Sequence, residues 1–334
     1  TMQWPTGAGE AVVHVVVVDP KSNGLEIRPA LGGPLVRSLC SVLTIAKVHE
    51  AVAAVNGGFF SPRERVPLGM LVIDGEWMRA PLTNRPVFAV MQDGSCDISR
   101  VAFEAGVHFE ELGFLPLLGI NQNHWENNSV VVFTERWGPS APAASGTTRL
   151  VVSACKRVVH RDTSGKELAI PAGGMVISGN GRRAETLQKV PLGRQVTLSY
   201  ATRPSWPKLK HALGGGPLLL AGGKIVLNAA AEGFRSDVAN GRRPRTAVGI
   251  RADGRIVIAT VEGPPLGRGS GMTLAELARF MQKLEAQAAM NLDGGSSTTL
   301  IVENKVITKC SSGSPRLVNN ALVVAPPRSS SAAD

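Results

Sequence analysis

Aromatic residues are scarce in this chain. Only 4% of its 334 residues are Phe, Trp or Tyr, and Tyr200 is the single tyrosine. Proteins that bind single-stranded nucleic acid without sequence preference stack the bases on aromatic side chains. The scarcity therefore argues against a nucleic-acid partner. The net charge of +10 still favours anionic ligands, such as phosphorylated substrates or acidic envelope polymers, although a merely basic soluble surface explains it equally well.

Long apolar runs are also missing. No stretch approaches the roughly 18 apolar residues that a membrane span needs, so we predict no span. The hydrophobic fraction of 43% is ordinary for a globular protein. We expect residues 1–325 to form one domain and residues 326–334, which are rich in Pro, Ser and Ala, to form a disordered tail. The opening at Thr1 shows no basic and apolar leader, which fits a mature protein as well as a cytosolic one.

Cysteine is rare and widely spaced. The four cysteines, Cys40, Cys96, Cys155 and Cys310, form no C-x-x-C pair, which argues against a structural zinc site or a thioredoxin-like site. One or two disulfides and buried thiols are both compatible with this spacing. Clusters of His and Asp at metal-ligand spacing are lacking too. We therefore predict no cofactor and no catalytic metal, and we leave open a structural divalent cation. The sequence does not indicate the oligomeric state.

Turn signals between apolar runs indicate a protein rich in β-hairpins. Asp-Gly pairs occur at 74–75, 93–94 and 253–254, and they favour two-residue type I′ turns because both residues tolerate positive φ. Gly222-Gly223 and Asn304-Lys305 predict two more hairpins. The valine-rich run 14–18 predicts a buried strand in which His14 is a core histidine.

Helices are predicted at only a few places. Residues 36–49 have helical spacing, and Thr273 with Glu276 forms a capping box before an apolar helical face. The fold class is therefore α+β: a single β-rich domain of mixed, mostly antiparallel sheet with two or three packed helices.

The most informative stretch is 291–299, Asn-Leu-Asp-Gly-Gly-Ser-Ser-Thr-Thr. Asp293 stands at the end of a short apolar strand, and two glycines and four hydroxyl residues follow it. Glycines allow a sharp turn and a close approach of backbone N–H groups to a ligand. A tight turn in which Asp293 caps backbone amides is the alternative, but the run of hydroxyls favours a functional site.

Similar patterns occur elsewhere in the chain. Asn56 ends the apolar strand 51–55 and precedes Gly57-Gly58, so this loop and the loop of Asp293 are expected to face one site. Glu262 is a second carboxylate at a strand end. Arg245 and Thr246 begin the apolar strand that precedes it, and the planar fork of an arginine matches phosphate well. The loop 121–128, which contains Trp125, is either a sugar contact or a solvated surface loop.

Several motifs in fixed order resemble the phosphodiester glycosidase family: Asn56-Gly57-Gly58-Phe59-Phe60, Leu213-Gly214-Gly215-Gly216-Pro217, Arg245-Thr246-Ala247-Val248-Gly249, the helix 273–281, and 291–298. The resemblance covers the chain from about Asn56 to Val324 and extends to Pro315-Arg316-Leu317-Val318. Two departures concern substrate identity. Glu262-Gly263-Pro264 stands where many bacterial relatives have Asp-Gly-Arg, and only two glycines follow Asp293 where relatives often have three.

The resemblance implies hydrolysis of a glycosyl phosphodiester at the anomeric carbon, which releases a sugar and a phosphomonoester. It implies Asp293 and Glu262 as the acid/base or nucleophile pair. The expected substrate-binding residues, with Arg245 and Arg316 on the phosphate, are Asn56, Gly57, Arg245, Thr246, Gly294, Gly295, Ser296, Ser297 and Arg316. The partner is then a phosphorylated carbohydrate.

Three alternatives stay open: a non-catalytic binder of anionic glycans, another glycoside hydrolase activity on the same scaffold, and a phosphodiesterase that cuts P–O bonds. The last would more usually need metal ligands. Because bacterial relatives often act at the cell envelope, the resemblance also implies a secreted or periplasmic protein.

Overall fold

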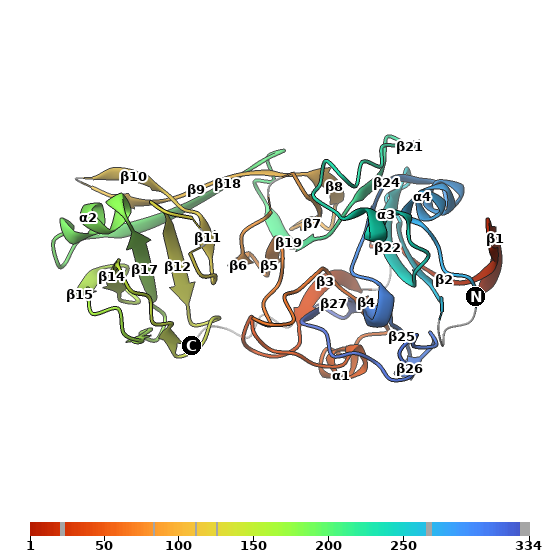
Figure 1. The fold of residues 1–334 in the computed structure, drawn as a ribbon, viewed down its shortest axis with the longest axis horizontal. Coiled ribbons are helices and arrows are strands. Elements are labelled where there is room, and N and C mark those ends of the chain that lie inside the picture. Colours follow the sequence, from red (N-terminus) through yellow and green to blue (C-terminus); the bar gives the residue numbers. More distant parts are fainter. Residues whose placement is uncertain (21–23, 83, 111, 125, 265–268, 328–334) are drawn as a thin grey trace.

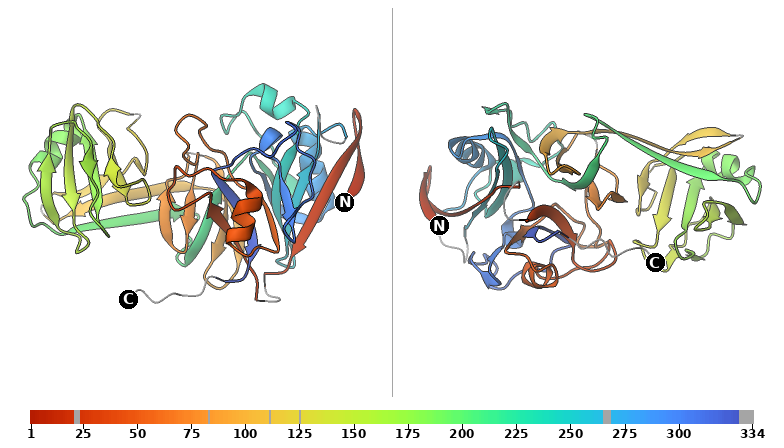
Figure 2. Two further views of the ribbon diagram at one scale, coloured as in Figure 1. Left: turned by 90° about the horizontal axis from the view of Figure 1, so that it is seen from below. Right: turned by 180° about the vertical axis from the view of Figure 1, so that it is seen from behind.

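The computed structural model describes residues 1–20, 24–82, 84–110, 112–124, 126–264 and 269–327. Trp125 and residues 328–334 of the expected tail lie outside this part. The molecule is elongated, with a large body at one end and a smaller lobe at the other (Figure 1). Two long antiparallel strands, β9 (Ala102–Phe109) and β18 (Val196–Arg203), run between them. Figure 2 shows the same arrangement from two further sides.

A seven-stranded sheet with α4 on one face forms one side of the body. Its strands lie in the order β1 (Met2–Thr6), β2 (Gly9–Val18), β23 (Ile256–Val261), β22 (Arg245–Arg251), β24 (Ala286–Asn291), β20 (Leu218–Ala221) and β21 (Lys224–Ile225). Helix α4 (Leu274–Lys283) begins at the predicted capping box, in which Thr273 Oγ1 accepts from the Glu276 amide and Glu276 Oε2 accepts from the Thr273 amide. Its apolar face is fully buried against this sheet, as the helical spacing predicts.

Two five-stranded sheets complete the body. One has the order β26 (Lys305–Val306), β25 (Leu300–Val302), β4 (Ala53–Asn56), β27 (Asn320–Ala325) and β3 (Glu26–Leu31), with α1 (Val42–Val48) packed on it. The other has the order β6 (Glu76–Arg79), β5 (Leu71–Ile73), β19 (Leu209–Gly214), β7 (Pro86–Met91) and β8 (Cys96–Arg100). One large apolar core joins residues of all three sheets.

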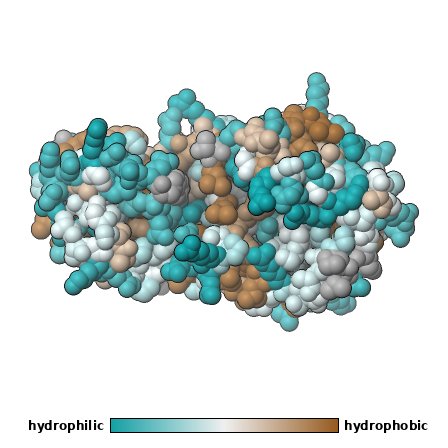
Figure 3. Space-filling view, viewed as in Figure 1, coloured by the Kyte–Doolittle hydropathy of each residue, from teal (hydrophilic) through white to brown (hydrophobic). Residues whose placement is uncertain are grey.

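The lobe has a core of its own between β9, β18 and a five-stranded sheet. That sheet has the order β11 (Gly119–Ile120), β12 (Val130–Thr134), β17 (Met175–Asn180), β14 (Thr147–Val152) and β15 (Val158–Asp162), with α2 (Arg182–Gln188) packed on it. The remaining elements are β10 (Gly113–Pro116), the pair β13 (Ser140–Ala141) and β16 (Leu168–Ala169), and α3 (Ser236–Asn240). Hydrophilic side chains cover most of the lobe, and apolar patches lie between it and the body (Figure 3).

The predicted hairpins form, with two corrections to their turns. Asp74-Gly75 joins β5 to β6 with positive φ at both residues, as a type I′ turn requires. In the hairpins at 93–94 and 253–254 only the glycine has positive φ, because each aspartate keeps an ordinary conformation and accepts the amide of the residue two further on. The hairpin of β25 and β26 turns at 303–304, one residue earlier than predicted, and both of its turn residues have positive φ.

The helices also differ from expectation. The described residues contain four short α-helices rather than two or three, and the short α3 buries none of its side chains. Helix α1 begins at Val42 instead of near residue 36, because the Ser41 hydroxyl caps it by accepting the Thr44 amide (3.0 Å). Just before it, Cys40 forms a backbone bridge with Val318, which holds the chain extended.

The strand pairing, the cysteines, Asn121 and the lengths of the helices can also be compared with the predictions from the sequence. The described pairings are antiparallel except for β11 with β12, so the sheets are mixed and mostly antiparallel. The thiols of all four cysteines are free. Asn121 of the polar loop is buried and bonds the Met78 carbonyl and Thr134, so it supports the fold. None of the helices in the described part is long and apolar enough to cross a membrane.

Candidate active site

Asn56 joins two sheets of the body at the candidate site. It is the last residue of β4 and is buried. Its Oδ1 accepts hydrogen bonds from Thr246 Oγ1 (2.7 Å) and from the Thr299 amide (3.2 Å). Its Nδ2 donates to the carbonyl of Asp293 (2.6 Å). Since Thr246 belongs to β22 and Asp293 follows β24, one side chain fixes the sheet of β4 against the seven-stranded sheet. Asn56 and Thr246, which were both expected to bind the substrate, thus bind each other.

Asp293 begins a tight loop at the end of β24. Its amide donates to the Gly57 carbonyl (3.1 Å), and its Oδ1 accepts from the Gly294 amide (2.9 Å). The residue is partly exposed, whereas Asn291 and Leu292 before it are buried. Burial of the carboxyl raises the pKa of Asp293, and this outweighs the contacts with Ser297 and Gly294 and the positive charge of Arg316, which lower it. The carboxylate is therefore a stronger base than an ordinary aspartate.

Arg316 is the cation that faces Asp293. It is partly buried, its Nη1 donates to Ser296 Oγ (3.3 Å), and its Cζ lies 5.2 Å from the centre of the Phe60 ring. Ser296 is also partly exposed. The structure thus brings together three residues named from the sequence, Asp293, Ser296 and Arg316. They present a carboxylate, a hydroxyl and a guanidinium.

Several buried polar atoms near Asp293 in the chain lack a described partner. The Oγ1 atoms of Thr298 and Thr299 are buried and lack a hydrogen-bond partner among the described residues, and so does the Oδ1 of Asn291. Ser297 is buried, and its hydroxyl lies beside Asp293 without the geometry of a full hydrogen bond. Buried polar groups normally find partners, because leaving them unpaired costs about 1–3 kcal/mol each. Their concentration next to Asp293 is typical of a functional site.

The glycines of the two loops shape the site rather than present free amides. The Gly57 amide donates to the Asn320 carbonyl (3.0 Å), and the Gly58 amide donates to Asn320 Oδ1 (2.8 Å). A Cβ on Gly57 would lie 2.1 Å from Asn320 Oδ1, and one on Gly58 would lie 2.2 Å from the Gly214 carbonyl oxygen. The amide of Gly57 is thus bonded within the protein, and its contact with a ligand stays a prediction.

The glycine amides after Asp293 are also bonded within the protein. The Gly294 amide is bound to the Asp293 carboxylate, and the Gly295 amide donates to the Pro244 carbonyl (2.9 Å). A Cβ on Gly294 would lie 2.8 Å from that carbonyl oxygen, while Gly295 has a φ of +60°, which favours glycine. Both glycines are needed by the turn, and their N–H groups are bonded within the protein.

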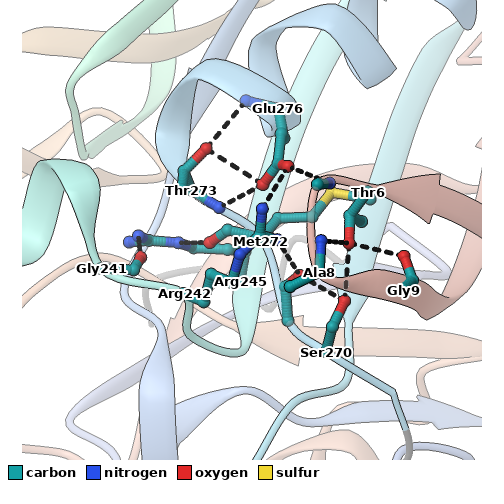
Figure 4. Close-up of polar contacts among 12 residues, drawn as sticks. Thr6, Ala8, Gly9, Gly241, Arg242, Arg245, Ser270, Met272, Thr273 and Glu276 are labelled. Carbon is teal, nitrogen blue, oxygen red and sulfur yellow. Dashed lines mark hydrogen bonds and ion pairs between the residues drawn. The ribbon is translucent and has the colours of Figure 1, made fainter.

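Arg245 does not lie where the sequence suggested. In β22 it pairs with Val261, on the face that packs against α4, whereas Thr246 points to the opposite face and to Asn56. Its guanidinium is buried and donates to the carbonyls of Met272 (2.9 Å) and Gly241 (2.7 Å) (Figure 4). It also donates to the carbonyl of Val238 (2.8 Å). Burial, with the nearby charge of Arg243, lowers its pKa to about 10. Arg245 therefore joins two segments of backbone, 238–241 and the residue before Thr273, through three carbonyls.

Glu262 is likewise engaged inside the protein. Its side chain has no exposed surface, and its Oε1 accepts from His14 Nε2 and from the Lys309 amide, both at 2.9 Å. The other ring nitrogen of His14 bonds Thr1 Oγ1 (2.7 Å), so His14 is the buried, partnered histidine that was predicted. Glu262 follows β23 and Asp293 follows β24, with β22 between them. Two strand spacings put their backbones about 10 Å apart. The structure shows no contact between the two expected catalytic carboxylates.

Asn319 and Asn320 hold the loops of the candidate site, and the sequence analysis did not name them. Asn320 holds Gly57 and Gly58, as described above. The Nδ2 of Asn319 donates to the carbonyls of Val36 (2.7 Å) and Arg65 (2.7 Å). Both asparagines are buried at the start of β27. The available signal was two consecutive amides directly before the apolar run 321–325, a pattern related to Asn56 at the end of its own strand.

The described residues include no group of three or more His, Cys, Asp or Glu side chains that could hold a metal ion. A cavity of about 420 Å³ beneath α1 is lined by apolar residues and by His49, Asp74, Glu76 and Arg136, and it contains none of the site residues.

Comparison with known proteins decides the family. A family model described as phosphodiester glycosidase matches residues 147–325, more than half of the chain. The chain belongs to the phosphodiester glycosidase family. A solved structure of a hypothetical protein from Synechocystis has 26% identity and a TM-score of 0.84 over 97% of this chain and 61% of its own. The structure of a Burkholderia pseudomallei protein, described as a candidate exported protein, has 22% identity and a TM-score of 0.77 over 95% of this chain and 74% of its own.

One curated relative is an uncharacterised prophage-derived protein of Bacillus subtilis, YomE. It is 39% identical over 88 residues, which are 26% of this chain but only 14% of that protein. The phosphodiester glycosidase chain thus spans less than two thirds of the Synechocystis protein and a small part of the Bacillus one. The family match contains Thr246, Asp293 and Arg316, whereas Asn56 and Gly57 lie before it and reach the site only through the fold.

Proposed function

We propose that this phosphodiester glycosidase hydrolyses a glycosyl phosphodiester at the anomeric carbon. The observation that carries the proposal is the combination of Asp293, a partly exposed residue whose carboxyl has a raised pKa, with the positive charge of Arg316 that acts on it. A phosphorylated sugar offers one group for each: an anomeric carbon for a water activated by the carboxylate, and an anionic leaving group for the cation. Family membership supports the same reaction class.

In the proposed reaction Asp293 is the general base. A water molecule attacks the anomeric carbon and gives its proton to the Asp293 carboxylate, while the bond between the anomeric carbon and the phosphate oxygen breaks. The phosphomonoester leaves with the bonding electrons. Because a phosphate oxygen is a weak base, its departure needs little protonation, and one carboxylate suffices. The raised pKa makes Asp293 a better base near neutral pH.

Arg316 and Ser296 are proposed to bind the phosphate. A guanidinium stabilises the charge that develops on the leaving oxygen, and a charge-assisted hydrogen bond is worth about 1.5–3 kcal/mol. We propose a positioning role for Asn56 and Thr246, and a structural one for Glu262 and Arg245, since all polar contacts described for these four are made within the protein.

Hydrolysis in water labelled with heavy oxygen tests the reaction class. Label in the sugar supports the glycosidase, whereas label in the phosphate would indicate cleavage of the P–O bond. Asp293→Asn should reduce turnover by at least about a thousandfold while the protein stays folded, because the amide keeps the acceptor for Gly294 but cannot take a proton. Normal turnover by this variant would remove Asp293 from the mechanism. Binding of glycosyl phosphodiesters without any turnover by the wild type would favour a non-catalytic glycan binder.

For the substrate and the cellular location we propose only a general class. A phosphorylated carbohydrate is the expected partner. A location outside the cytoplasm is suggested by the Burkholderia relative, which is described as exported.

A further inference from the structure

A second basic site lies where the body meets the lobe. A hollow of about 700 Å³ opens there between the loops that follow β3 and β4 and the segment around β13. The body contributes Leu35, Arg37, Arg63 and Arg65, and the lobe contributes 137–140, Pro142, Ala143 and Glu167. We call it the arginine hollow.

The three arginines of this hollow are not neutralised by carboxylates. Arg37, Arg63 and Arg65 are exposed, and none of them forms an ion pair within the described part of the chain. Other arginines are paired, for example Arg136 with Glu76 (2.7 Å) and Arg242 with Glu276 (2.6 Å). Three cations left unpaired around one concave surface produce a positive potential that attracts anions.

The other polar and aromatic groups of the hollow leave these arginines available. Glu167, its one carboxylate, accepts a short hydrogen bond from Ser140. The Cζ of Arg37 lies 5.1 Å from the centre of the buried Trp137 ring, which orients the guanidinium without consuming its N–H donors. The side chains of Arg63 and Arg65 form no hydrogen bond or ion pair with other described residues.

Two neighbouring asparagines connect the hollow to the candidate active site. Asn320 holds the loop of Gly57 and Gly58, which touches Asp293. Asn319 donates to the carbonyls of Val36 and Arg65, which fixes the two body segments that carry the arginines of the hollow. The Asn320 side chain also donates to Asn319 Oδ1 (3.1 Å). These hydrogen bonds therefore fix the position of the hollow relative to the candidate active site.

The distance between the sites is short. Phe60 lies beneath Arg316 at the active site, and Arg63 comes three residues later in the chain. Three residues of extended backbone reach at most about 11 Å. An extended polymer bound through Arg316 can span such a length, and it meets a second set of cations in the hollow.

We infer that the arginine hollow is an anion subsite for a second charged group of the substrate, so the substrate is a polyanionic glycan or a polymer with repeated phosphates. This inference rests on the proposed function for the identity of the first group. A substrate with a single phosphate fills the active site alone. A substrate with repeated anionic groups fills both and is held more tightly.

Binding measurements test the subsite without requiring turnover. The variant Arg37→Gln, Arg63→Gln, Arg65→Gln removes three charges from the hollow. The matched control Arg182→Gln, Arg183→Gln, Lys189→Gln removes three charges from α2 and the residue that follows it, on the lobe. We would measure the affinities of the wild type and of both variants by isothermal titration calorimetry at low and at moderate salt. The ligands are inorganic polyphosphate and, as the probe with a single anion, inorganic phosphate.

The hollow variant should bind polyphosphate about tenfold more weakly than the wild type, and the control variant should not, because three exposed ion pairs together amount to roughly one decade of affinity. If both variants lost the same affinity for polyphosphate, the loss would come from the lower net charge of the protein, and the subsite proposal would be wrong. No loss in the hollow variant would overturn it as well. Polyphosphate binding that depends on the hollow, found together with an inactive enzyme, would refute the proposed hydrolysis while it preserves the subsite.

Discussion

Asn56 and Asp293 are 237 residues apart in the sequence, yet the Asn56 side chain donates a 2.6 Å hydrogen bond to the Asp293 backbone. The same side chain accepts from Thr246 and Thr299. One buried amide thus sets the position of the proposed catalytic loop relative to two sheets. Consequently, the geometry around Asp293 depends on a residue that lies outside the segment matched by the family model.

Replacing Asn56 should damage both stability and catalysis. Asn56→Ala leaves Thr246 Oγ1 and the Thr299 amide without their acceptor, which costs about 1–3 kcal/mol for each buried group. Asn56→Asp keeps that acceptor but replaces the donor to Asp293 with a carboxyl oxygen, so it disturbs mainly the loop of Asp293. We therefore expect Asn56→Asp to unfold closer to the wild-type urea midpoint while kcat falls strongly. If the two variants lost stability equally and kept kcat, Asn56 would be a packing residue without influence on the loop.

A mechanism with one carboxylate predicts inversion at the anomeric carbon. A double displacement needs two carboxyl groups roughly 5 Å apart, and Glu262 is instead buried against His14. The anomer formed first, followed by proton NMR before mutarotation, should have the configuration opposite to that of the substrate. A retained configuration would require a second group at the site and would return Glu262 or a hydroxyl to the mechanism.

Arg316→Gln should impair phosphodiesters selectively. Loss of one charge-assisted contact, worth about 1.5–3 kcal/mol, corresponds to a decrease of about 10- to 150-fold in kcat/KM. A neutral nitrophenyl glycoside offers no phosphate and should be affected far less. The charge of Arg316 also lowers the pKa of Asp293, so the variant should move the acidic limb of the pH–rate profile to higher pH. If the acidic limb did not move and kcat/KM fell equally on both substrates, Arg316 would contact neither the phosphate nor Asp293.

Arg245→Lys should act on stability. A lysine cannot reproduce bonds to three separate carbonyls, so we expect a lower urea midpoint and little change in kcat/KM for the folded enzyme. The exposed Arg203→Lys is the control. A selective loss of activity on phosphodiesters, with stability unchanged, would restore Arg245 as the phosphate ligand.

His211 should make the protein sensitive to acid. Its ring is fully buried and its Nδ1 accepts the Asp74 amide (3.1 Å), which requires the neutral form. Burial lowers the pKa of His211 to about 4, although the carboxylates of Asp74 and Glu26 act in the opposite direction. The unfolded chain, with a pKa near 6.5, takes up the proton first. This contribution to stability is therefore complete above about pH 6.5 and is lost as the pH falls toward 4.

Urea unfolding at intervals between pH 4 and pH 7 measures this loss, which we expect to be about 3 kcal/mol. His211→Gln should be less stable at pH 7 but should show a flatter pH dependence. The exposed His108→Gln should follow the wild-type curve. A curve for His211→Gln as steep as that of the wild type would assign the acid sensitivity to other groups.

The sequence by itself determined the features that depend on near neighbours. The capping box of Thr273 and Glu276 and the predicted hairpins depend on residues a few positions apart, and they form. The loop of Asp293 follows from a carboxylate and two glycines at a strand end. The order of the motifs was enough to identify the family. Local chemistry could not show that the glycine amides are already bonded, because Asn320 and Pro244 lie far away in the sequence.

Only the tertiary structure decided which way the polar side chains point and what they meet. Arg245 and Thr246 are adjacent, but strand alternation sends one under α4 and the other to Asn56, and the sequence does not say which face carries the site. Glu262 bonds His14, which lies 248 residues away in the sequence. Because of this contact, the proposed mechanism gives Glu262 no chemical role. The arginine hollow exists because the lobe returns to the body beside 63–65. Such contacts come from the packing of distant strands, and a single sequence carries no local signal for them.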